Sequence, residues 1–211
     1  MPDSLSVRPA SAHEAPTIAA VLATASQDEA VVSWVVPDER VRRERLAASL
    51  EQATQWLSDV VAGGGVVVAG TEDASIAGLS VWEYEDGTDT GSEASAAELA
   101  AFFEPTYGEY APRMALVHEL TRRRHPRTEA HWYLQQMVVV PEQRGRGLGA
   151  AMLRYRLARA DADRVPVYLE ASTPRNRALY ERHGFHPLGD PIRLPEDGPA
   201  IQPMWRPTTP G

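Results

Sequence analysis

The sequence of 211 residues contains no cysteine, which excludes disulfide bonds, thiolate zinc sites and a cysteine nucleophile. Lysine is absent as well, so all 21 basic residues are arginine. No apolar run approaches the roughly 18 residues of a membrane-spanning helix, and the first ten residues lack the apolar core of a signal peptide. We therefore expect a cytoplasmic protein that does not bind membranes.

The charge balance is acidic, with 29 Asp and Glu against 21 Arg and a formal net charge of −8. Nonspecific nucleic-acid binding depends on a basic surface that neutralises phosphates, so nucleic acid is not an expected partner. A cationic or small neutral partner fits the charge better. The length suits one domain, or one domain with a sizeable insertion, and we expect a monomer or homodimer.

Hydrophobic periodicity predicts the elements of the first part of the chain. They are a strand over Leu5–Arg8, helices over Ala15–Ala25 and from Pro37 to Gly63, and a hairpin of Val66–Ala69 with Ile76–Glu83 around Glu72-Asp73. After Tyr84 the pattern is weak, with helical pieces near Ser95–Phe103 and Tyr110–Arg123. We interpret residues 84–130 as an acceptor-side insertion beside a binding cleft, because long connections in compact domains are commonly functional.

The last third of the chain is more regular. A buried strand over Trp132–Val140 precedes a glycine-rich turn and a helix over Leu148–Ala162. The sequence then predicts a strand over Val167–Ala171, a helix that begins at Thr173-Pro174 and ends at Gly184, and strands over Phe185–Leu188 and Ile201–Trp205.

The glycine-rich turn reads Arg144-Gly145-Arg146-Gly147-Leu148-Gly149. Its glycines permit a close approach of backbone to ligand, and the free N–H groups and dipole of the following helix favour an anion. The two arginines add donors suited to phosphate oxygens. The turn is either such an anion site or an ordinary strand-to-helix connection. A mononucleotide P-loop is excluded, because Ala150 and Ala151 stand where Lys and Ser or Thr are needed, and the glycines are misspaced for a dinucleotide fingerprint.

This turn resembles the acetyl-coenzyme A signature of the GNAT N-acetyltransferase superfamily. The resemblance continues through Leu169–Asn176 and Tyr180–Phe185, is specific over about residues 130–190, and fails over Tyr84–Arg127. Within the superfamily, the chain most resembles puromycin N-acetyltransferase and its relatives. The resemblance implies a single α/β domain whose mixed central sheet has splayed middle strands and is flanked by helices.

By this resemblance, acetyl-CoA is the cosubstrate, its diphosphate lies on the backbone amides of the turn, and its pantetheine arm runs beside the preceding strand. The apolar side chains of this strand would pack in a core whether or not a ligand binds. Any contact of these residues with the pantetheine arm is therefore expected mainly from their backbone. No metal is expected. His183 and His186 have a spacing found in metal sites, but Gly184 breaks the helix between the two imidazoles. The implied cofactor-binding residues are Met137, Val138, Val139, Arg144, Gly145, Arg146, Gly147, Leu148, Gly149, Ala150, Asn176 and Tyr180.

Tyr180 is, by the resemblance, the general acid aimed at the thioester sulfur, with Asn176 four residues earlier on the same helix face. A thiol pKa of about 8.5 against about 10 for tyrosine makes full proton transfer uphill by roughly 2 kcal/mol. Tyr180 then helps mainly as a hydrogen-bond donor, and the alternative is a tyrosine that packs between helix and sheet. The implied oxyanion donor is the main-chain N–H of Val138, give or take one residue.

Glu170 is the preferred catalytic or water-positioning carboxylate, because it ends a predicted central strand, where open α/β sheets place ligands. His118 and Glu83 are alternatives, and each of the three also fits a purely structural role. Aromatic residues near the acceptor side offer stacking surfaces, and acidic ones attract a cationic amine. The candidate substrate-binding residues are Trp34, Trp82, Glu83, Tyr110 and His118.

The sequence thus predicts an enzyme that moves the acetyl group of acetyl-CoA directly to a primary amine. The preferred acceptor is a small molecule such as an antibiotic or a metabolite. The alternatives are acetylation of a peptide or protein amine, and a catalytically silent protein that binds or senses acyl-CoA.

Overall fold

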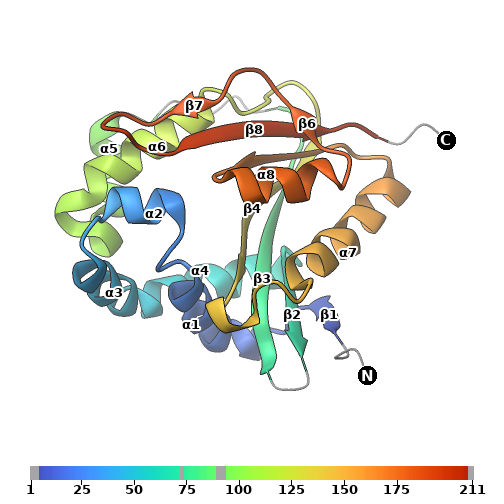
Figure 1. The fold of residues 1–211 in the computed structure, drawn as a ribbon, viewed down its shortest axis with the longest axis horizontal. Coiled ribbons are helices and arrows are strands. Elements are labelled where there is room, and N and C mark those ends of the chain that lie inside the picture. The colour runs from blue at the N-terminus through green and yellow to red at the C-terminus, as the bar shows by residue number, and fades with distance from the viewer. Residues whose placement is uncertain (1–4, 72–73, 89–93, 209–211) are drawn as a thin grey trace.

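The computed structural model describes residues 5–71, 74–88 and 94–208, so the predicted turn at Glu72-Asp73 lies outside the described residues. An eight-stranded mixed sheet runs in the order β1-β2-β3-β4-β5-β8-β6, and β7 also pairs with β8 (Figure 1). Among the strands of the described residues, only β4 and β5 pair in parallel. The strands are β1 (Ser6–Pro9), β2 (Val66–Thr71), β3 (Ala74–Glu85), β4 (His131–Val139), β5 (Val167–Ala171), β6 (His186–Pro187), β7 (Ile192–Arg193) and β8 (Ala200–Arg206).

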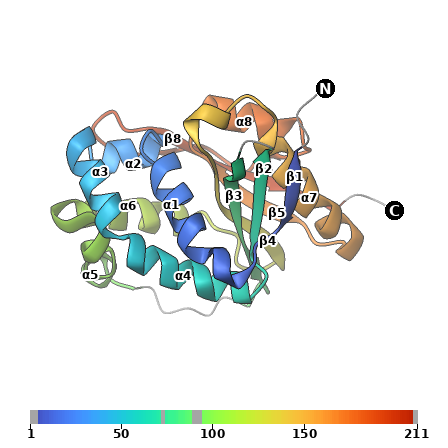
Figure 2. The ribbon, with the colours of Figure 1, turned by 90° about the horizontal axis from the view of Figure 1, so that it is seen from below.

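Helices cover both faces of this sheet. The α-helices are α1 (Ala15–Ala25), α2 (Ala30–Val35), α3 (Glu39–Ala48), α4 (Leu50–Ala62), α5 (Ala96–Tyr107), α6 (Ala111–Arg122), α7 (Leu148–Asp163) and α8 (Pro174–Glu181), and the 3-10 turns are η1 (Ala12–Glu14), η2 (Gly108–Tyr110) and η3 (Pro141–Gln143). Helices α1 and α4 pack on one face through Ile18 and Leu57, and α7 packs on the other through Met152 and Leu153 (Figure 2). A third core cluster joins α2 and α6 to the segment of β7 and β8.

Two differences from the predicted elements have local causes. The predicted helix from Pro37 to Gly63 is two helices, because Ser49 ends α3 with its hydroxyl donating to the Leu46 carbonyl at 3.1 Å. The sequence did not predict α2, which begins at Glu29. The Glu29 carboxylate accepts from the backbone N–H groups of Val31 and Val32 at 2.8 and 2.9 Å, which caps this short helix.

The two middle strands diverge. Parallel pairing of β4 with β5 covers only residues 132–134 against 167–169, while β4 continues to Val139. Next to this point, the β3 register jumps from Gln136 to Leu134, which leaves Gln135 as a bulge that bends β4. The predicted α/β fold, with a splayed mixed sheet flanked by helices, is confirmed.

No helix within the described part of the chain is both long enough and apolar enough to cross a membrane.

Candidate active site

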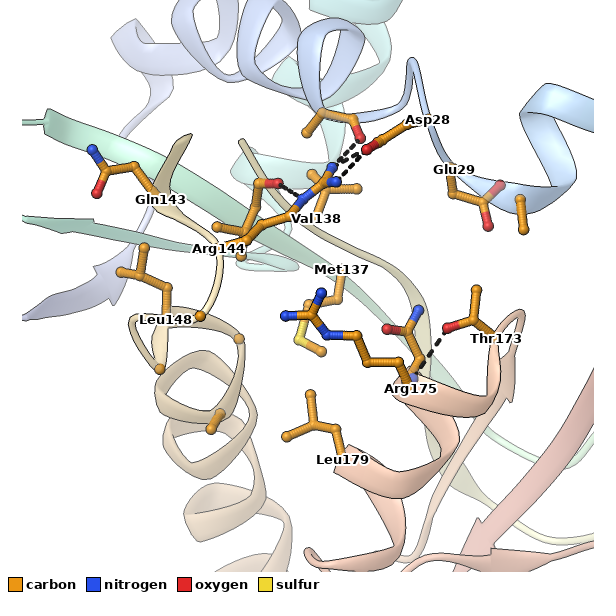
Figure 3. A pocket seen from close by; sticks show the side chains of 18 of the residues that line it. Asp28, Glu29, Met137, Val138, Gln143, Arg144, Leu148, Thr173, Arg175 and Leu179 are labelled. Carbon is orange, nitrogen blue, oxygen red and sulfur yellow. Dashed lines mark hydrogen bonds and ion pairs between the residues drawn. The ribbon is translucent and has the colours of Figure 1, made fainter. Parts of the chain in front are cut away.

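A cavity of about 440 Å³ opens where β4 leaves β5 (Figure 3). Its walls are the loop between α1 and α2, the end of β4, the glycine-rich turn with the start of α7, and one face of α8. Arg146 and Tyr180 are not among the lining residues. The predicted cofactor-binding residues that line the cavity are Met137, Val138, Val139, Arg144, Gly145, Gly147, Leu148, Gly149, Ala150 and Asn176.

The glycine-rich turn has the backbone geometry of an anion site. Gly145 and Gly147 have φ of +82° and +86°, a left-handed conformation that side chains disfavour. Gly147 precedes α7, and its carbonyl accepts from the Ala151 N–H at 2.9 Å. The N–H groups of residues 148–150 therefore have no acceptor within the helix. A Cβ atom on Gly145 would meet nothing within 4 Å, so the turn is open to a ligand. A diphosphate fits these donors.

Four of the five N–H donors of Arg144 are already engaged, which leaves one N–H of Nη1 for a phosphate. Its Nε donates to the Val139 carbonyl at 2.9 Å, and its Nη2 donates to the Ala25 carbonyl at 3.1 Å and to Asp28 Oδ1 at 2.7 Å. Its Nη1 forms a second contact with the Asp28 carboxylate (Figure 3). This ion pair raises the pKa of Arg144 and lowers that of Asp28. The predicted phosphate ligand therefore ties the turn to the α1–α2 loop.

The end of β4 presents backbone groups to the cavity. The Val140 N–H donates to the Ala77 carbonyl of β3 at 2.9 Å, and alternate residues of an antiparallel strand share one edge. The backbone N–H and C=O groups of Val138 consequently point towards β3. Those of Met137 and Val139 point towards the opposite edge of β4, where β5 no longer pairs with it. The Val139 carbonyl at this edge accepts from Arg144. The register therefore favours Met137 or Val139 over Val138 as the residue with a free N–H, within the one-residue margin of the prediction.

Tyr180 is 6% exposed and packs edge-on against Phe185, with 5.8 Å between ring centroids. Burial raises its pKa, and the negative charge of Glu29 raises it further. The same two causes raise the pKa of Tyr107 to about 12. Glu29 lines the cavity where the α1–α2 loop forms its wall, and its charge acts on both phenols, of which Tyr180 is buried and Tyr107 half-buried. This part of the cavity is suited to a cationic group.

Glu170 is not among the residues that line the cavity, and the hydroxyl groups of Tyr133 and Tyr168 lie near its carboxylate. Burial raises the pKa of Glu170 to about 7, which the hydroxyl groups of Tyr133 and Tyr168 partly offset. Within the described residues, Glu170 Oε1 and the Tyr168 hydroxyl are buried without hydrogen-bond partners. A buried carboxylate with an unsatisfied oxygen is unfavourable for stability and frequent at functional sites.

The predicted substrate-binding residues do not form one group. Trp34 and Tyr110 belong to the same cluster beside α6, and Arg113 stacks on the Trp34 ring at 4.9 Å. His118 is exposed on α6, 5.9 Å from the Phe103 ring, and Glu83 is exposed on β3. Trp82 is separate, because it is 2% exposed on the α7 face and its indole N–H donates to Ser80 at 2.9 Å. Its position gives it a packing role.

Several residues of the cavity wall were not predicted from the sequence. Asp28 and Glu29 precede a short helix whose periodicity is too brief to detect, although a carboxylate before Ala-Val-Val is a usable capping signal. The cavity-facing arginines of α8, Arg175 and Arg182, carry no signal in the sequence. In the described part of the chain, no group of three or more His, Asp or Glu is arranged to hold a metal ion.

Comparisons with known proteins agree with this geometry. Residues 113–187, from α6 to β6, match the family model of the acetyltransferase (GNAT) domain. A Corynebacterium glutamicum structure described as histone acetyltransferase HPA2 and related acetyltransferase is 27% identical, with a TM-score of 0.71 over 99% of this chain and 98% of its own. The polyamine N-acetyltransferase of Drosophila melanogaster is 18% identical, with a TM-score of 0.64 over 97% and 100%. Arylalkylamine N-acetyltransferase 2 of Aedes aegypti is 14% identical, with a TM-score of 0.68 over 98% and 100%.

Residues 113–187 therefore match a GNAT acetyltransferase domain, and the chain has the fold of that class of enzyme. The narrower likeness to puromycin N-acetyltransferase and its relatives stays a prediction.

Proposed function

We propose that this protein transfers the acetyl group of acetyl-CoA directly to a primary amine of a small molecule, such as an antibiotic or a metabolite, in the cytoplasm. The observation that carries this proposal is one continuous cavity. It begins at the open amides of the glycine-rich turn, follows the unpaired edge of β4 and reaches Glu29. An elongated cosubstrate with a diphosphate at one end and a thioester at the other matches this arrangement.

The acceptor end of the site supports an amine. Glu29 offers a carboxylate for an ammonium group, and the structural neighbours include proteins named as polyamine and arylalkylamine N-acetyltransferases. In our proposal the insertion at residues 84–130 completes this side through α5 and α6, with Trp34 and Tyr110 in the adjoining cluster.

Three groups of this chain then carry the chemistry: a carboxylate, a backbone N–H and a tyrosine hydroxyl. Glu170, or Glu29 at the cavity wall, accepts the ammonium proton directly or through water. The neutral amine attacks the carbonyl carbon, and an N–H of Met137 or Val139 stabilises the oxyanion. As the carbon–sulfur bond breaks, the Tyr180 hydroxyl donates a hydrogen bond to the departing thiolate. The second proton of the attacking nitrogen passes through water to the thiolate, which leaves the N-acetylated amine and the thiol of CoA. With no cysteine in the chain, transfer within a ternary complex is preferred to an acetyl-cysteine intermediate.

A panel of amines tests the proposal. We expect the purified protein to release CoA from acetyl-CoA with a small amine such as agmatine or an arylalkylamine, and the amine to gain one acetyl group in mass spectrometry. Activity on peptides alone would replace the small-molecule acceptor by a peptide amine. Binding of CoA without transfer to any amine would identify a silent acyl-CoA-binding protein.

The Arg144–Asp28 pair gives a second test. We expect Arg144→Ala and Asp28→Ala each to raise the KM for acetyl-CoA by about three- to tenfold, because each releases the turn from the α1–α2 loop. The double variant should be no worse than either single variant, as measured by steady-state kinetics. If Arg144→Ala alone raises this KM, Arg144 binds the phosphates directly, as the sequence suggested.

A further inference from the structure

One face of α8 lines the cavity with two arginines. Arg175, Leu179 and Arg182 follow one another at four- and three-residue steps, so they share a face of the helix, and all three line the cavity. Figure 3 shows the Arg175 side chain extending from α8 towards Met137 and the turn that carries Arg144. The cavity wall opposite the amides is therefore positively charged.

Both arginines are exposed, and within the described part of the chain neither guanidinium group makes a hydrogen bond or an ion pair. The other cations nearby are already engaged. Arg144 is held by Asp28, Arg146 Nη1 donates to Gln143 at 2.5 Å, and Arg177 pairs with Glu181 at 2.8 Å on the same helix. Arg175 and Arg182 thus have free donors on a wall of the proposed cosubstrate site.

The position of Arg175 is unfavourable for the isolated helix. It follows Pro174 in the first turn of α8, where the helix dipole favours negative charge. It also lies two turns from Arg182, a group of the same sign. The Arg175 guanidinium has no partner among the described residues and is repelled by the positive end of the helix dipole. An anion bound beside it would compensate for this unfavourable position.

We propose that Arg175 and Arg182 bind the phosphomonoester on the ribose of coenzyme A, and so make the enzyme discriminate coenzyme A from dephospho-coenzyme A. This inference rests on the proposed function, which supplies the ligand. The diphosphate of that ligand occupies the amides of residues 148–150 on the facing wall, so the monoester is the phosphate that remains. It carries about two negative charges near neutral pH, which two guanidinium groups match.

Binding of CoA and dephospho-CoA, which differ only in the monoester, tests the proposal. Isothermal titration calorimetry is run on the full chain, on Arg175→Ala with Arg182→Ala, and on Arg177→Ala. We expect the double variant to bind CoA at least about tenfold more weakly, and dephospho-CoA with an affinity changed by less than about twofold. Arg177→Ala is the matched control, since Arg177 lies on α8 outside the cavity lining, and it should bind both ligands like the unmodified protein.

Each other outcome overturns the inference in a distinct way. An equal loss of affinity for both ligands would place the arginines on the diphosphate. No loss for either ligand would leave them without a binding role. An unmodified protein that binds neither ligand would overturn the proposed function itself. The thermal midpoint of the double variant checks that folding is intact.

Discussion

Replacement of Tyr180 by phenylalanine is expected to lower kcat by about 100-fold while the affinity for CoA changes by less than about twofold. The physical reason is the loss of one hydrogen-bond donor at the departing thiolate. Phenylalanine keeps the edge-on contact with Phe185, so the packing of α8 against the sheet is preserved. Rapid-quench or steady-state kinetics together with calorimetric CoA binding separate these two effects.

The environment of Tyr180 decides what kind of help it gives. Burial and Glu29 both raise its pKa, so the phenol is a weaker acid than a free tyrosine. Complete proton transfer to a thiolate is then even less favourable than in reference conditions. We therefore expect Tyr180 to stay neutral and to act as a hydrogen-bond donor, and kcat of the unmodified enzyme to show no basic limb from its ionisation.

Tyr155→Phe is the control for Tyr180→Phe. Tyr155 lies on α7 and is 42% exposed, so loss of its hydroxyl should leave kcat unchanged. If Tyr180→Phe turns over as fast as this control, the phenol has only a packing role.

Replacement of Glu170 by glutamine is expected to have the second large effect. It should lower the activity and raise the stability of the folded protein. We expect kcat/KM at pH 8 to fall by about 100-fold through loss of a proton acceptor. We also expect the free energy of unfolding at pH 8 to rise by about 2 kcal/mol, because a buried carboxylate is replaced by a neutral amide.

The direction of the pH dependence follows from the pKa of Glu170, which burial raises to about 7 in the folded protein from about 4.5 in the unfolded chain. Between these values the folded state holds the proton more tightly, so the contribution of Glu170 to stability is lost as pH rises. The stability gain of Glu170→Gln should therefore be absent below about pH 4.5, grow towards pH 7 and then level off. The activity of the unmodified enzyme should fall below about pH 7, where Glu170 is protonated.

Chemical denaturation at several pH values and a pH profile of kcat/KM measure both effects. The unmodified protein and the Glu170→Gln variant share all other groups near this position, including Tyr133 and Tyr168, so the difference between them isolates Glu170. Glu51→Gln, an exposed residue in the first turn of α4, is the control and should change neither quantity. If Glu170→Gln raises stability while its pH profile matches that of the unmodified enzyme, Glu170 is not the proton acceptor.

Local signals in the sequence were sufficient where a short segment determines its own structure. The helix over Ala15–Ala25 and the strand over Val167–Ala171 have the predicted bounds. Thr173 caps α8 by accepting from the Asn176 N–H at 3.1 Å, as the Thr-Pro pair indicated. The glycine-rich turn has the left-handed glycines that an anion site needs.

The roles of side chains whose partners are far away in the sequence could not be predicted from local patterns. Arg144 is paired with a residue 116 positions away, which no local pattern discloses. Trp82 and Glu83 are neighbours in sequence, yet strand alternation places their side chains on opposite faces of the sheet. The α1–α2 loop brings Glu29 to the cavity through a helix too short for its periodicity to be recognised.

The α/β alternation and the glycine-rich turn could be predicted from the sequence, because each depends on residues within about one helical turn or one strand length of each other, and the resemblance supplied the candidate tyrosine. Which arginine is free depends instead on the three-dimensional fold. The turn lies against the α1–α2 loop, so the Asp28 carboxylate neutralises Arg144, while Arg175 and Arg182 face the cavity from α8 without a partner in the described residues. Charge pairing is a matter of distance in space, and the fold sets that distance.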